Sequence, residues 1–111
     1  MTNKEILKKA IEKAVKNGWD ILDWYLEIDD PERERLKKEN DWEWLVSFLA
    51  SEQELKSGLT ASMIFSHDFA KAFWGKKPFQ LKYKTKIPWK YHLQQMVLEE
   101  EPIKYLEQFL Q

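Results

Sequence analysis

The feature that most constrains the fold is an amphipathic helix predicted at the start of the chain. Thr2 and Glu5 have the spacing of a capping box, in which each side chain binds the backbone N–H of the other residue. Gly18 offers a stop for the helix that follows. We expect this helix to pack against the last two helices of the chain. Its apolar face consists of Ile6, Leu7, Ala10, Ile11, Ala14 and Val15.

Three more helices are predicted in the second half of the chain from their start and stop signals. Ser66 is a suitable N-cap and Gly75 a suitable left-handed stop for a short helix. Pro88 and Pro102 would each occupy a first helical turn, where a missing backbone N–H costs little. The apolar stripes of these last two helices are Trp89, Leu93, Met96 and Val97 in one, and Ile103, Leu106 and Leu110 in the other.

Residues 19–28 fit two kinds of secondary structure. Leu22, Trp24 and Leu26 alternate as on one face of a strand. Trp24 and Tyr25 also fall on one face of a helix. We expect the strand, with the helix as the alternative.

Two short helices are predicted in the segment that follows. Asp30 and Pro31 combine an N-cap with a first-turn proline. Asp41 could cap a second helix, for which Gly58 offers the stop. A rival strand over residues 42–48 is favoured by tryptophans two positions apart, whereas the length of the segment favours the helix.

Residues 76–87 have the clearest strand pattern in the chain. Phe79 and Leu81 lie on one face of a two-residue repeat, and lysines lie on the other. A lone strand cannot satisfy its backbone hydrogen bonds, so residues 19–28 or 42–48 would have to pair with it.

These elements predict a single domain over residues 1–111. Its fold class is α+β and mostly helical, with four or five helices and a small antiparallel sheet of two or three short strands. The length of 111 residues suits one domain, and three glycines with four prolines leave little room for long loops. Six tryptophans could nearly fill a core of this size, so we expect most of them to be buried.

Two segments of the chain resemble a group of small proteins encoded by phages and metagenomic contigs. They are residues 64–75, reading IFSHDFAKAFWG, and residues 89–110, reading WKYHLQQMVLEEEPIKYLEQFL; a first helix ending in Asn17, Gly18 and Trp19 adds to the likeness. The resemblance implies an origin in a mobile element. It implies no activity, and no site residues are carried over from it.

The composition restricts where the protein works. No apolar run approaches the ~18 residues of a membrane span, and residues 1–9 lack the apolar core of a signal peptide. Together with the phage resemblance, this predicts a soluble protein in the cytoplasm of an infected or lysogenic bacterial host. The oligomeric state is left open.

Catalytic chemistry finds little support in the sequence. There are no cysteines, which excludes disulfides, thiol catalysis and Cys-ligated metals. His67 and Asp68 form a pair of the kind found in metal-dependent phosphohydrolases, but His92 is the only other histidine. A place for Asp68 in the first turn of a helix, where a carboxylate interacts favourably with unpaired backbone amides, explains the pair better. We therefore expect no catalytic residues, no metal and no cofactor.

A basic segment over residues 76–90 supports one functional alternative. It contains six lysines and no acidic residue, interleaved with aromatic residues, as in platforms for single-stranded nucleic acid. Lysines and rings lie on opposite faces of the predicted strand, however, so we expect the lysines mainly to protect an exposed edge. The candidate nucleic-acid contacts are Lys76, Lys77, Lys82, Lys84, Lys86 and Lys90.

An acidic stretch supports the function that we favour. Residues 19–56 hold twelve acidic and five basic residues, with Trp24, Trp42 and Trp44 among them. Exposed aromatic residues give affinity to protein interfaces, and surrounding charges select the partner. The absence of catalytic motifs and the resemblance to mobile-element proteins lead us to expect a non-catalytic accessory protein of a phage or mobile element that binds a host or phage protein. The three tryptophans are the candidate docking residues. Inhibition of a host defence system would be one form of this function, and weak nucleic-acid binding without sequence specificity is the alternative.

Overall fold

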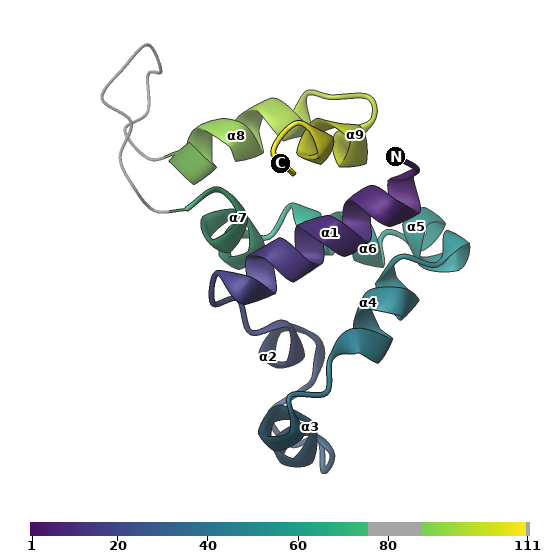
Figure 1. The fold of residues 1–111 in the computed structure, drawn as a ribbon, viewed down its shortest axis with the longest axis vertical. Coiled ribbons are helices and arrows are strands. Elements are labelled where there is room, and N and C mark those ends of the chain that lie inside the picture. The colour runs from purple at the N-terminus through teal and green to yellow at the C-terminus, as the bar shows by residue number, and fades with distance from the viewer. Residues whose placement is uncertain (76–87, 111) are drawn as a thin grey trace.

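The computed structural model describes residues 1–75 and 88–110, and this part of the chain consists of helices joined by short loops (Figure 1). No described helix is long and apolar enough to cross a membrane. The nine described helices are α1 (Asn3–Lys16), α2 (Ile21–Tyr25), α3 (Arg33–Glu39), α4 (Glu43–Leu49), α5 (Glu52–Ser57), α6 (Leu59–Ile64), α7 (His67–Trp74), α8 (Pro88–Val97) and α9 (Pro102–Glu107).

Helix α1 begins with the predicted capping box. The Glu5 amide donates to the Thr2 hydroxyl at 3.2 Å, and the Thr2 amide donates to the Glu5 carboxylate at the same distance. Two N–H groups that the helix itself cannot pair are thereby satisfied. These bonds lower the pKa of Glu5, the backbone bond from Thr2 contributing most. The prediction of this helix is confirmed.

Helix α1 crosses the middle of the molecule, with α8 and α9 on one side and α2 to α4 on the other (Figure 1). It packs against α9, α7 and α4. Helix α8 contacts α7 and α9, so the first helix and the last two belong to one packed group, as expected. The core between these elements contains Ile6, Leu7 and Ile11 of α1, Leu45 and Leu49 of α4, Phe69 and Phe73 of α7, Met96 of α8 and Leu106 of α9.

The strand expected over residues 19–28 is wrong, because this segment contains helix α2. The Asp20 carboxylate accepts a hydrogen bond from the Asp23 amide at 3.0 Å, which caps the helix. Ile21 and Leu22 are both buried, although a strand would place adjacent residues on opposite faces. The local cap therefore outweighed the alternating pattern.

Residues 42–48 also form a helix, so the helical reading of this segment is confirmed. Leu45 and Leu49 are four residues apart and completely buried, as expected for one face of α4. Asp41 does not cap this helix; the N-cap position is Trp42, which makes no side-chain cap bond. The helix also ends early, and Ser51 caps a separate helix, α5, which Gly58 ends at a φ of 93°.

The fold class therefore has to be corrected from α+β to helical for residues 1–75 and 88–110, which contain no strand. Both segments proposed as partners for the lysine-bearing strand are helices, so neither supplies a sheet. The predicted strand over residues 79–87 lies outside the described residues.

The helix signals of the second half of the chain are largely confirmed. The Ser66 hydroxyl accepts from the Phe69 amide at 3.3 Å, and Gly75 ends α7 at a φ of 83°. Helices α8 and α9 begin at their prolines. The prediction for Val97 is wrong, because 61% of its surface is exposed, whereas the apolar stripe placed it inward.

In the first half of the chain, α3 starts at Arg33 and not directly after Asp30. The Asp30 carboxylate instead accepts a hydrogen bond from the Glu32 amide at 2.8 Å.

Thr2→Ala should lower the free energy of unfolding by about 1 kcal/mol, because it removes the acceptor for the Glu5 amide at the start of the central helix. Thr2→Ser keeps a hydroxyl in the same place and should stay close to the wild-type value. Urea denaturation followed by circular dichroism measures both. Equal losses in the two variants would show that the capping bond does not stabilise the fold.

Candidate functional site

Three aromatic side chains meet at the surface between α2 and α4. The Tyr25 ring centroid lies 6.1 Å from that of Trp44 and 6.1 Å from that of Phe48, and both pairs are edge to face. Trp44 is 40% exposed and Phe48 is 38% exposed, whereas Tyr25 is half-buried. We call these three residues the aromatic face.

The sequence exposes these rings because the opposite sides of their helices are needed for the core. Trp44 and Phe48 are four residues apart and therefore lie on one side of α4. Leu45 and Leu49 lie on the other side and are completely buried in the core that α1 shares. Tyr25 is the last residue of α2, whose first two residues are buried.

Contacts within the protein hold the aromatic face in place. The Trp44 indole N–H donates to the backbone carbonyl of Asp41 at 3.0 Å, which fixes the orientation of that ring. Tyr25 also contacts Trp24 at 6.2 Å between ring centroids, and Trp24 lies 6.0 Å from the buried ring of Trp19. A continuous row of rings thus connects the surface with the core, which restricts ring motion before any partner binds.

The charges beside the aromatic face are acidic and uncompensated. Glu27, Asp41 and Glu43 are exposed and lie within three residues of a ring of this face in the sequence. Asp29 is exposed on the loop after α2. Across residues 1–75 and 88–110, none of these four carboxylates forms an ion pair with a basic group. The surface around the rings therefore carries negative charge that no ion pair within the described residues neutralises.

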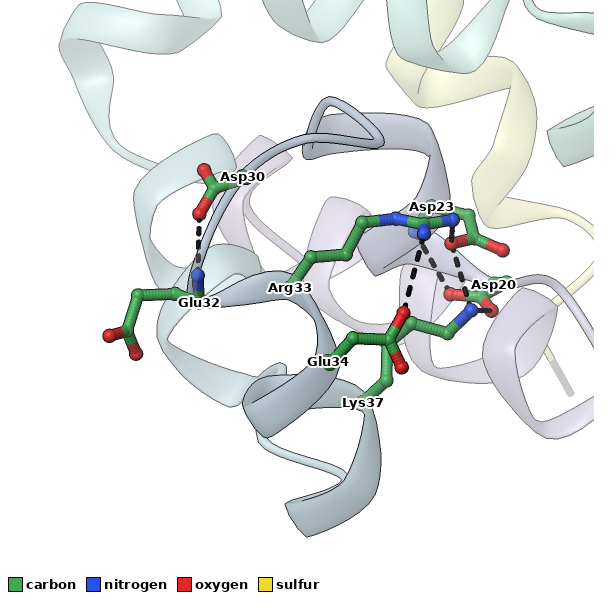
Figure 2. Close-up of polar contacts among 7 residues, drawn as sticks. All are labelled: Asp20, Asp23, Asp30, Glu32, Arg33, Glu34 and Lys37. Carbon is green, nitrogen blue, oxygen red and sulfur yellow. Dashed lines mark hydrogen bonds and ion pairs between the residues drawn. The ribbon is translucent and has the colours of Figure 1, made fainter.

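Two basic residues of the same region pair with other acids. Figure 2 shows Arg33 and Lys37 of α3 reaching towards Asp23 of α2 and towards Asp20, the residue that caps this helix. Arg33 pairs with Asp23, and the Lys37 ammonium lies 3.0 Å from Asp23 and 3.5 Å from Asp20. The hydrogen bond from Lys37 is the largest cause that lowers the pKa of Asp23. These pairs hold α3 to α2. They direct Arg33 and Lys37 to Asp20 and Asp23, and not to the carboxylates beside the aromatic face.

The predicted docking tryptophans occupy different environments. Trp44 is exposed as part of the aromatic face, whereas Trp24 and Trp42 are half-buried and pack against the core. Tyr25 and Phe48 were not among the predicted site residues. The spacing of Trp44 and Phe48 on one helical turn could have identified Phe48, but only once the segment was known to be helical.

The predicted nucleic-acid contacts are only partly covered by the structure. Lys76, Lys77, Lys82, Lys84 and Lys86 lie outside the described residues. Lys90 is exposed at the start of α8, and its ammonium lies 5.7 Å from the Trp89 ring centroid.

A cleft of about 760 Å³ lies where the end of α1 meets α2 and α7. Asp20 and Trp24 line it from one side, and Asp68 and Lys71 from the other. Its described lining contains no hydroxyl or thiol that could act as a nucleophile, and Asp20 already faces Lys37.

The two histidines have separate aromatic neighbours. The exposed His67 ring lies 5.3 Å from the Trp89 ring, and Asp68 occupies the first turn of α7 as predicted. Within the described part of the chain, no three His, Asp or Glu side chains converge as metal ligands would.

His92 is enclosed by rings from α7, from α9 and from the segment that follows α9. It stacks on Trp74 of α7 at 5.3 Å, meets Phe109 beyond α9 at 4.8 Å, and its Nδ1 lies 3.1 Å from the Tyr105 hydroxyl of α9. Burial in this position lowers the pKa of His92, because a charged imidazolium loses hydration there.

Stability should fall as the pH drops through the range in which free histidine titrates. The pKa of histidine in an unfolded chain is about 6.5, so below that pH the unfolded state binds a proton that native His92 resists. Urea denaturation at about pH 8 and about pH 5.5 should show a smaller loss in His92→Gln than in the wild type. His67→Gln is the control and should keep the wild-type loss. An unchanged pH dependence in His92→Gln would contradict this role.

No protein-family model, curated protein or solved structure matches this chain. The likeness to phage-encoded proteins therefore remains a prediction. The function has to be argued from the aromatic face and its charges.

Proposed function

We propose that this chain is a non-catalytic accessory protein of a phage or mobile element, which binds a host or phage protein in the bacterial cytoplasm. The observation that carries the proposal is the aromatic face of Tyr25, Trp44 and Phe48. Tryptophan and tyrosine are enriched among the residues that dominate protein–protein binding energy. Inhibition of a host defence system is one form that such binding could take.

The arrangement of the face suits an interface that forms without large rearrangement. Its rings are held by the Trp44 bond to Asp41 and by the row of rings that leads to Trp19. Side chains already held in place lose less conformational entropy on binding. Burial of Trp44 and Phe48 by a partner would also remove apolar surface from water.

The charges of this surface favour a protein partner over nucleic acid. Glu27, Asp41 and Glu43 would repel the phosphates of DNA or RNA brought to the aromatic face. The nucleic-acid alternative depends on lysines that lie mainly outside the described residues, so no described contact supports it.

Site-specific photo-cross-linking tests the proposed function. Ser47 is exposed on α4 between Trp44 and Phe48 in the sequence, so a p-benzoylphenylalanine at this position would touch a partner on the aromatic face. In a lysate of bacteria that express the protein, we expect an adduct of defined mass from position 47. The exposed position Glu12 on α1 is the matched control and should give none.

The double substitution Trp44→Gln and Phe48→Gln should abolish the adduct from position 47. Because both side chains are more than one third exposed, the variant should keep its helical circular dichroism spectrum. An adduct of equal yield in the folded double variant, or equal yields from positions 47 and 12, would contradict a protein-binding role for this face.

A further inference from the structure

We infer that the aromatic face binds an arginine-rich segment of its partner protein, an inference that rests on the proposed function. Three independent features of the described residues lead to this chemistry. They are the unpaired carboxylates, the uncovered ring faces and the distribution of hydrogen-bonding groups.

The first feature is an imbalance of charge that a partner can correct. Glu27, Asp29, Asp41 and Glu43 form no ion pair in the part of the chain that the structure describes. The arginines of α3 have acidic partners elsewhere, because Arg33 pairs with Asp23, and Arg35 pairs with Glu32 and Glu39. Complementary charge across an interface steers association and selects the partner. A basic segment is the complement of this surface.

The second feature is that no cation of the described residues covers these rings. In residues 1–75 and 88–110, cations lie above Phe73 and Trp89, and they come from Lys13, Lys71 and Lys90. No cation from this part of the chain lies above Tyr25 or Trp44. Their ring faces carry negative electrostatic potential and attract a guanidinium or ammonium group.

The third feature distinguishes arginine from lysine. The indole N–H of Trp44 already donates to Asp41, so that residue offers a partner mainly its ring face. The Tyr25 hydroxyl makes no hydrogen bond with any described residue and can accept one. A guanidinium can stack on one ring and still donate sideways to a hydroxyl or carboxylate, whereas an ammonium is a compact, strongly hydrated charge. Phe48 would contact the apolar residues beside the arginines.

Peptide titration tests the inference directly. The probe is an amphipathic peptide with leucines on one face and four arginines on the other, compared with the same peptide carrying glutamine for every arginine. The indole N–H signal of Trp44 in ¹⁵N–¹H spectra of the full chain reports on the site. We expect saturable shifts with the arginine peptide, at least about tenfold weaker binding of the glutamine peptide, and weakening between about 50 and about 300 mM salt.

Charge reversal supplies the second arm. The double substitution Asp41→Lys and Glu43→Lys should lower the affinity for the arginine peptide by about tenfold or more. The matched control is Glu99→Lys with Glu100→Lys, two exposed acids in the loop between α8 and α9, and it should bind as the wild type does.

Any one of three results would overturn the inference. The first is equal affinity for the arginine and glutamine peptides, and the second is an equal effect of the two charge-reversed variants. The third is the lack of any shift at Trp44 with either peptide. None of these results removes an adduct from position 47, so failure of the arginine preference is distinguishable from failure of the proposed function.

Discussion

Burial of the apolar face of α1 is the interaction on which the rest of the structure depends. Its residues Ile6, Leu7 and Ile11 have no exposed surface, and burial of such side chains contributes about 1.5 to 3 kcal/mol each. The helices that cover this face are short, and α9 has only six residues. Helices of that length are not stable alone in water, so they form because α1 offers them a surface to pack against.

The candidate site depends indirectly on the packing around α1. Leu45 and Leu49 attach α4 to the core, and this attachment turns Trp44 and Phe48 towards solvent. Ile21 at the start of α2 is buried, and Tyr25 at the end of this helix lies beside Trp44 and Phe48. The ion pairs of α3 engage Arg33 and Lys37 with Asp20 and Asp23, and not with the acids beside the rings. Core packing and surface charge therefore produce one acidic, aromatic surface.

Local signals in the sequence predicted the elements that have unambiguous caps, and failed where two periodicities overlap. The caps at Thr2 and Ser66 and the stop at Gly75 were readable because each satisfies the backbone within a few residues. Helix α2 was expected only as the alternative, because alternating apolar residues match a strand. The Asp20 cap and the burial of both Ile21 and Leu22 favour the helix. Trp44 was predicted as a docking residue from composition. Its neighbour Tyr25 could not be predicted as a docking residue, because its contact with Trp44 joins two different helices and is not visible in the sequence.

Native-state hydrogen exchange tests most directly whether the helix that carries Trp44 and Phe48 is held by the core around α1. If α4 is held through Leu45 and Leu49, its central amides should exchange with nearly the same free energy as those of α1, through one cooperative opening. Exchange of α4 by a local opening several kcal/mol below that of α1 would contradict the account. The aromatic face would then not be preformed.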